Sequence, residues 1–149
     1  MRLRILLALA VAAALVAVPI AAGATKKSHA VDSTARMAVI SESGASPLRW
    51  AGEVVGKPGG RSAILLQSTL SGSAATGKAI QYTKKGAIFA TTANTVEGQP
   101  DGSTHFPGTF KVTGGTGKYR GATGGGTFDG TLPANGTVLV AKLKGKIRY

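Results

Sequence analysis

Hydrophobic and polar residues alternate with a period of two through much of the chain after residue 34. The clearest case is the C-terminal segment, where Leu139, Ala141 and Leu143 fall on one face and Lys142 and Lys144 fall on the other. Alternation of this kind is typical of a β-strand with one buried face. Similar segments are residues 35–40, 48–55, 62–70, 78–83, 87–95, 104–112 and 127–132. Together with residues 137–148, they predict about eight strands.

The composition supports a single all-β domain. The chain contains 22 glycines and many threonines, which punctuate the short alternating segments as turn and strand residues do. Beyond the N-terminal region, no long segment has the period of an amphipathic helix. We therefore predict one antiparallel β-barrel of about eight strands over residues 35–149, a size at which a barrel holds packed side chains or one small ligand.

Residues 1–24 have the pattern of a secretory signal peptide. Arg2 and Arg4 precede an apolar run over residues 5–18, and small residues follow it up to Ala24. An uncleaved membrane anchor is the alternative, but the run is shorter than the roughly 20 apolar residues that span a bilayer, and a proline ends it. We expect cleavage after Ala24 and a secreted, extracellular protein.

A glycine-rich stretch separates two of the predicted strands. Phe106 and Phe110 share one face of the first strand, and a run of glycines begins soon afterwards at Gly114 and continues to Gly117. Residues without a Cβ atom adopt positive φ values and let two backbone segments approach closely, so a tight reversal is expected here. Residues 118–122 are long enough for a single helical turn before further glycines lead into the next strand.

The residues of this turn resemble a family signature. They are Gly114, Gly115, Thr116, Gly117, Tyr119, Arg120, Ala122 and Gly124. Over residues 103–132 the pattern is similar to the glycine-rich signature of plant dirigent proteins and allene oxide cyclase-like barrels, of which this chain would be an exported, bacterial-type member. Arg120 is closer to the dirigent version, because the cyclases usually carry an acidic residue there.

The resemblance implies an eight-stranded antiparallel barrel, often a homotrimer, with an apolar cavity that handles oxylipins or phenolic radicals. No catalytic residue of those families is carried over, because the segments that hold them do not align with this chain. A glycine-rich signature specifies backbone geometry, so the resemblance argues for fold more than for activity.

The chain is strongly basic. It has 18 Lys and Arg against 6 Asp and Glu, a net charge of +12, and without Arg2 and Arg4 the 16 remaining cations give +10. Such a charge attracts anionic lipids and wall polymers. Nucleic acid is not expected as a partner, because the protein is predicted to be exported and its aromatic residues do not alternate with basic ones. Residues 25–34, which are polar and basic, are expected to form a flexible tether.

Four cations occupy alternate positions in the last predicted strand. They are Lys142, Lys144, Lys146 and Arg148. One interpretation is an adhesive stripe for an anionic wall polymer or a membrane surface. The other, which we favour, is a solvated face that also discourages edge-to-edge aggregation.

Candidate catalytic chemistry is sparse. Cysteine is absent, which excludes disulfides and thiolate chemistry. His29 lies in the expected tether and His105 at a strand start, so neither a metal site nor a cofactor is expected. Among the six carboxylates, Glu53 beside Trp50 and Asp129 near the glycine-rich turn are the candidates for a general acid whose pKa is raised by burial. For both, we favour the alternative of a solvent-facing position.

The predicted barrel is compatible with functions of different classes. The first is a binding protein whose interior takes up a small hydrophobic molecule. The wall residues expected to contact that molecule are Phe106, Phe110, Ile64, Leu66 and Leu139, or their neighbours on the opposite face. The second is an isomerase or cyclase in which an acid such as Glu53 acts on a folded substrate, and the third is a filled barrel that acts through its basic surface. Aromatic residues make up only 5% of the chain, which favours a lipid-like ligand over one that stacks on a ring.

Overall fold

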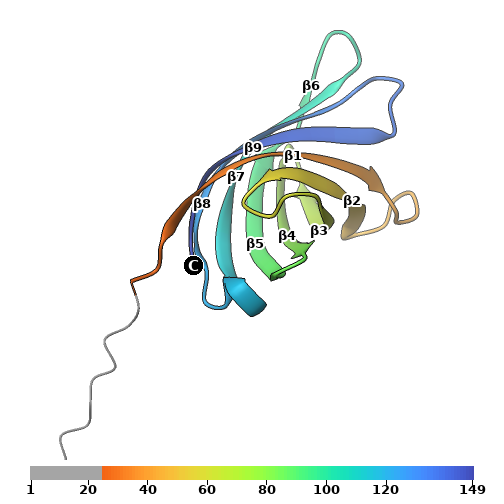
Figure 1. Ribbon diagram of the computed structural model, residues 1–149. Coiled ribbons are helices and arrows are strands. Elements are labelled where there is room, and N and C mark those ends of the chain that lie inside the picture. Colours follow the sequence, from red (N-terminus) through yellow and green to blue (C-terminus); the bar gives the residue numbers. More distant parts are fainter. Residues whose placement is uncertain (1–24) are drawn as a thin grey trace, which may run out of the picture.

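The computed structural model describes residues 25–149, which form a closed barrel of eight antiparallel strands with one short extra strand (Figure 1). The predicted signal peptide, residues 1–24, lies outside the described residues. The strands are β1 (Ser28–Val39), β2 (Leu48–Lys57), β3 (Ser62–Ser71), β4 (Ala74–Thr83), β5 (Gly86–Thr95), β6 (Glu97–Gly98), β7 (Thr104–Gly115), β8 (Thr123–Leu132) and β9 (Val138–Arg148). The predicted fold class, an all-β antiparallel barrel, is confirmed.

Each long strand pairs with the next long strand along the chain, so the barrel is an up-and-down meander. The β1–β9 pairing then closes it, running from Ser28 opposite Arg148 to Ala38 opposite Val138. The β5–β7 pairing bypasses the short β6, which pairs separately with the start of β7. Closure leaves no long strand of residues 25–149 with a free edge, and free edges are the sites at which sheets aggregate.

β1 begins earlier than the sequence indicated. Only residues 25–27 precede it, so the expected tether over residues 25–34 is wrong for most of its length. Val31 is buried inside the barrel, whereas Asp32 beside it is exposed. Polar residues of the segment lie on both faces, since Ser33 is also buried. The strand forms because β9, at the other end of the chain, pairs with it.

The connections between strands gather at the two ends of the barrel. One end, termed the mouth, has the connections 40–47, 72–73, 96–103 and 133–137. The other, termed the closed end, has the segment 25–27, the turns 58–61 and 84–85, the connection 116–122 and Tyr149. The 3-10 helix η1 (Gly117–Tyr119) lies in the connection between β7 and β8, at the lower end of the barrel in Figure 1. Within residues 25–149, no helix has the length and apolar character needed to cross a membrane.

The hydrophobic core consists of two clusters. The cluster toward the closed end contains Val31, Ile88, Phe110, Val112, Tyr119, Ala122 and Ile147. The second cluster contains Ala35, Met37, Trp50, Val54, Ile64, Leu139 and Ala141. Tyr119 is only 2% exposed, because it packs from η1 onto inward-facing residues of the surrounding strands. This packing closes one end of the barrel.

β8 and β9 approach so closely that two inward-facing positions require glycine. Gly126 and Gly145 lie opposite each other in the two strands. A Cβ atom added to either residue would lie 2.7 Å from the Cα atom of the other. The glycines at 124–126, expected to precede a strand, therefore lie within β8, which begins at Thr123. The strong coiling of strands in a small barrel accounts for this close approach.

We predict that Gly145→Ala destabilises the barrel, because the added methyl group meets backbone atoms of β8. The free energy of unfolding should fall by about 2 to 3 kcal/mol, as is typical of overpacking against a rigid neighbour. Urea unfolding followed by the emission of Trp50, the only tryptophan of the chain, measures the change.

The matched control is Gly98→Ala, because no atom lies within 4 Å of the Cβ position at Gly98. This variant should change the free energy of unfolding by less than about 0.5 kcal/mol. Equal effects of the two substitutions would show that the approach of β8 and β9 does not require glycine.

Candidate ligand-binding cavity

The interior of the barrel contains a cavity of about 380 Å³. All eight long strands line it, because alternate side chains of every strand point inward. The volume lies in the range of about 300 to 1,000 Å³ that is usual for small-molecule sites. The barrel therefore encloses space that its own side chains do not fill.

The five wall residues expected from the sequence all line the cavity. They are Phe106, Phe110, Ile64, Leu66 and Leu139. Their contact with a ligand stays a prediction. Sequence reasoning missed Met37, Trp50 and Phe128, which also line the cavity. The signal that could have placed the indole inside is its spacing, because Trp50 shares one strand face with Leu48 and Val54.

The cavity opens at the mouth. Two of its lining residues there, Val39 and Leu70, are 43% and 47% exposed. Ile40 and Val138, at the same end, are 59% and 41% exposed. Exposed apolar groups that continue an internal cavity are typical of a binding entrance. Apolar surface thus extends from the interior to the rim.

The polar groups of the wall are uncharged. They are Ser33, Ser68, Gln81, Thr92, Asn94 and Thr104. Four of them lie on the halves of β3, β5 and β7 nearest the mouth: Ser68, Thr92, Asn94 and Thr104. Trp50 Nε1 donates a hydrogen bond to Ser68 Oγ at 3.1 Å. Hydroxyl and amide groups placed in this way can hydrogen-bond an uncharged polar group of a ligand.

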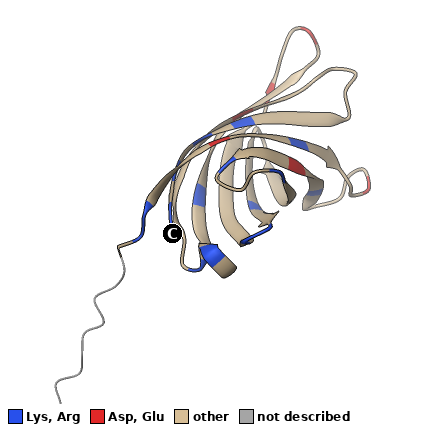
Figure 2. Cartoon of the chain, viewed as in Figure 1, with Lys and Arg blue, Asp and Glu red and all other residues tan. Residues whose placement is uncertain are grey.

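The two candidate acids do not line the cavity. Glu53 is on the outer face of β2, where its carboxylate lies 3.2 Å from Arg61 Nη1, and its side chain is 42% exposed. Asp129 is on the outer face of β8, and its side chain is 69% exposed. Figure 2 marks the acidic residues in red. The structure thus agrees with solvent-facing positions for both carboxylates, and none of the lining residues among 25–149 is charged.

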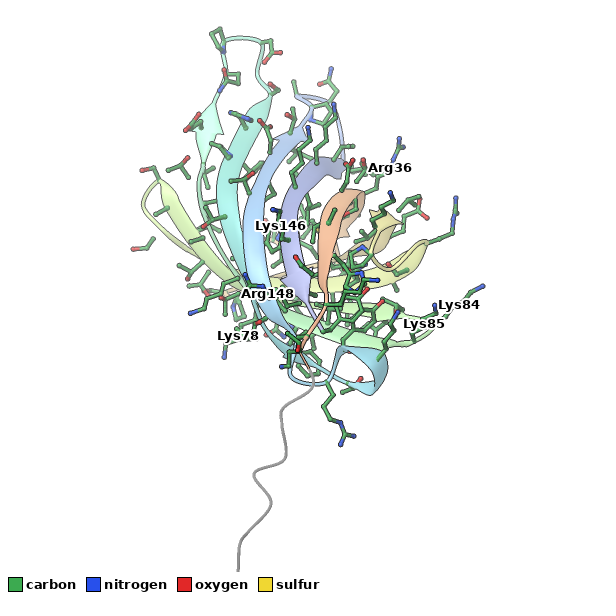
Figure 3. The ribbon with its side chains drawn as sticks, turned by 60° about the vertical axis from the view of Figure 1, so that its left-hand side comes forward. Arg36, Lys78, Lys84, Lys85, Lys146 and Arg148 are labelled. Atoms are coloured by element: carbon green, nitrogen blue, oxygen red, sulfur yellow. The ribbon has the colours of Figure 1, made fainter. Side chains whose placement is uncertain are left out.

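The four cations predicted at alternate positions all lie on the outer face of β9. They are Lys142, Lys144, Lys146 and Arg148, and all are exposed. Figure 3 shows Lys146 and Arg148 on this strand. Asp129 lies opposite Lys142, and Asp32 lies opposite Lys144. Carboxylates on both flanking strands therefore offset part of the positive charge of this row.

The glycine-rich turn has a structural role at the closed end. Its residues Gly114, Gly115, Gly117, Tyr119, Arg120 and Gly124 extend from the end of β7 through η1 into β8. Gly117 has a φ of 56°, a value that favours glycine. Tyr119 is buried, Arg120 is exposed, and the ring of Tyr119 meets that of Tyr149 edge-on with centroids 4.8 Å apart. The turn shapes the end of the cavity and does not line its entrance.

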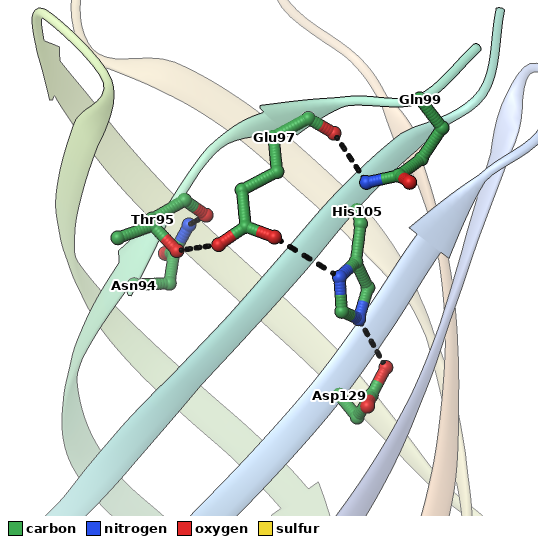
Figure 4. Close-up of polar contacts among 6 residues, drawn as sticks. All are labelled: Asn94, Thr95, Glu97, Gln99, His105 and Asp129. Carbon is green, nitrogen blue, oxygen red and sulfur yellow. Dashed lines mark hydrogen bonds and ion pairs between the residues drawn. The ribbon is translucent and has the colours of Figure 1, made fainter.

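A histidine between two carboxylates lies outside the cavity near the mouth (Figure 4). His105 Nε2 lies 2.8 Å from Asp129 Oδ1, and Nδ1 lies 3.4 Å from Glu97 Oε2. Thr95 Oγ1 donates a hydrogen bond to the other oxygen of Glu97 at 2.9 Å. These contacts attach β6 to the outer face of β7 and β8. Sequence reasoning missed them because they depend on the pairing of β7 with β6 and β8, which the sequence of one strand does not reveal.

No group of three His, Asp or Glu side chains within residues 25–149 is placed to hold a metal ion. The second histidine, His29, lies at the closed end, where it stacks on Tyr149 with ring centroids 4.2 Å apart. The two histidines are therefore at opposite ends of the barrel.

We predict that His105 titrates above its ordinary pKa of 6.5, chiefly because of its hydrogen bond to Asp129. Desolvation is the next largest effect and lowers the pKa, while the charge of Asp129 and the contact with Glu97 raise it further. A raised pKa in the folded state means that the stabilisation is complete below pH 6.5. It is lost as the pH rises through the raised pKa. Proton NMR of the histidine ring, assigned with a His29→Gln variant, measures the titration.

Asp129 and Glu97 should contribute unequally to the raised pKa of His105. Asp129→Asn should lower the pKa of His105 more than Glu97→Gln does, because the shorter contact is to Asp129. A pKa of His105 at or below 6.5 in the intact protein, or no change in Asp129→Asn, would contradict the arrangement in Figure 4.

Comparison of the chain with family models, with curated proteins and with solved structures finds no significant match. The geometry of the cavity and the placement of charges on the surface therefore carry the functional assignment.

Proposed function

We propose that the protein binds one small, lipid-like molecule inside the barrel. The observation that carries this proposal is the cavity of about 380 Å³, whose lining is apolar apart from six uncharged side chains and which opens at the mouth. Transfer of apolar surface from water into such a space is favourable at roughly 25 cal/mol per Å². A molecule that matches the walls would thus bind without any charged contact.

The positions of the polar groups favour a particular orientation of the ligand. The apolar part would lie toward Ile88, Val112 and Ile147 at the closed end, and a hydroxyl, ester or amide group would lie near Ser68 and Asn94 at the mouth. The wall formed by residues 25–149 has no cation that could pair with a carboxylate group of a bound ligand. The preferred class is therefore an uncharged amphiphile.

The glycine-rich signature supports the same proposal. Its resemblance to dirigent and allene oxide cyclase-like barrels implies a cavity for oxylipins or phenolic radicals, which are small and largely apolar. The N-terminal pattern of residues 1–24 supports export. We therefore propose an extracellular binding protein of this barrel type.

An isomerase or cyclase activity is the less favoured alternative. General acid catalysis needs a titratable group within hydrogen-bond reach of the substrate, and the lining residues among 25–149 include no Asp, Glu, His, Lys or Tyr. Glu53 and Asp129 are on the outer face. Binding without turnover is the function that these placements support.

Bromoundecanol, a long-chain alcohol with a terminal bromine, tests the binding proposal. Bromine quenches tryptophan emission on contact, and Trp50 is both the only tryptophan and a wall residue of the cavity. We predict saturable quenching by bromoundecanol that unbrominated undecanol reverses by competition. Quenching that never saturates would contradict binding in the cavity.

Matched variants locate the binding site. Ala90→Phe places a ring in the cavity, whereas Ala93→Phe places the same ring on the exposed outer face of β5. The first variant should weaken binding by at least about tenfold, because the ring occupies the ligand's space. The second should bind as the unchanged protein does. Equal affinities for both variants would place the ligand outside the barrel.

A further inference from the structure

Exposed positive charge is concentrated at the closed end of the barrel. Three segments there carry six exposed cations. They are Lys26 and Lys27 before β1, Lys84 and Lys85 in the β4–β5 turn, and Lys118 and Arg120 in the β7–β8 connection. The connections at the mouth instead carry acidic residues, including Glu42 and Asp101. Figure 2 shows this difference between the two ends, with cations in blue.

The three segments are bonded to one another, so their cations form one surface. The backbone N–H of Lys118 donates to the carbonyl oxygen of Lys85 at 2.9 Å. Lys26 Nζ donates to the carbonyl oxygen of Gly121. Lys118 Nζ also lies 5.2 Å from the ring centroid of Tyr149. The backbone that presents these charges is therefore fixed before any partner arrives.

No Asp or Glu side chain within residues 25–149 forms an ion pair with any of these six cations. Two acids on the neighbouring strands have other neighbours, since Glu53 pairs with Arg61 and Asp32 lies opposite Lys57 and Lys144. The row on β9 forms no ion pair within residues 25–149 either, but Asp129 and Asp32 lie directly opposite two of its lysines on the flanking strands. An uncompensated cluster attracts an anionic surface more strongly than a flanked one.

We propose that the closed end docks on an anionic phospholipid bilayer and directs the mouth away from it. A bilayer is wide and flat, so it can meet cations from all three segments at once. The same surface repels the acidic loops at the mouth, which fixes the orientation.

Lys84 and Lys85 project from the turn between β4 and β5 (Figure 3). Lys146 and Arg148, on the outer wall of β9, lie toward the same end. These two wall cations extend the basic surface from the end onto one side of the barrel. Docking through the closed end does not depend on what the cavity binds.

Vesicle sedimentation tests the proposal with residues 25–149, which contain every strand and both hydrophobic clusters of the barrel. The probes are phosphatidylcholine vesicles with and without phosphatidylglycerol. We expect binding only to the anionic vesicles, and weaker binding as salt is added. The use of residues 25–149 removes any contribution of the apolar run.

Two variants with equal losses of charge separate the closed end from the wall. The end variant combines Lys84→Gln, Lys85→Gln, Lys118→Gln and Arg120→Gln. The wall variant combines Arg36→Gln, Arg49→Gln, Lys142→Gln and Lys144→Gln, at exposed positions on the outer faces of β1, β2 and β9. Each cation at an anionic bilayer raises the partition coefficient about fivefold. The partition coefficient of the end variant should therefore fall by at least about 100-fold. The partition coefficient of the wall variant should fall by less than about tenfold, because most of its substituted cations lie away from the docked surface.

Three results would overturn the proposal. They are no binding of the unchanged protein to anionic vesicles, equal losses in the two variants, and binding to soluble poly(glycerol phosphate) as strong per phosphate as to vesicles. The last result would identify a wall polymer as the partner.

Circular dichroism shows whether the end variant folds. If it does not, the double variant Lys84→Gln with Lys85→Gln decides, because it leaves η1 unchanged. This double variant should bind anionic vesicles at least about tenfold more weakly than the unchanged protein does.

Discussion

Closure of the sheet is the constraint on which the rest of this structure depends. The pairing of β1 with β9, and of β5 with β7, turns a meander of strands into a barrel. The curvature that closure requires brings β8 and β9 together at Gly126 and Gly145, where a Cβ atom has no room. The same curvature encloses a space that side chains from eight strands fill only in part. Glycine at these two positions is therefore a condition of closure.

The connection between β7 and β8 makes the two ends of the barrel different. Tyr119 packs inward from this connection and ends the apolar interior, while Lys118 and Arg120 face solvent on its outer side. At the mouth, by contrast, apolar residues such as Leu70 continue to the rim. A barrel docked by its closed end would keep this entrance open to the surroundings. One short segment thus links the depth of the cavity to the orientation that we propose.

Local alternation was sufficient to predict the strands and to place residues such as Phe110 and Leu139 inside the barrel. It was not sufficient where pairing between distant strands decides the outcome, because register leaves no mark in the sequence of one strand. The early start of β1 shows this, since the polar and basic residues at its start look like a tether until β9 pairs with them. The contacts of His105 with Glu97 and Asp129 were missed for the same reason.

Native mass spectrometry of the protein purified from the cells that make it tests the central claim most directly. We predict an added mass of one small apolar molecule per chain, released by organic solvent and strongly reduced in the Ala90→Phe variant, whose ring occupies part of the cavity. The same spectrum gives the number of chains in the assembly. A bare chain mass for the unchanged protein, identical in ligand content to the Ala90→Phe variant, would contradict a binding function for the barrel interior.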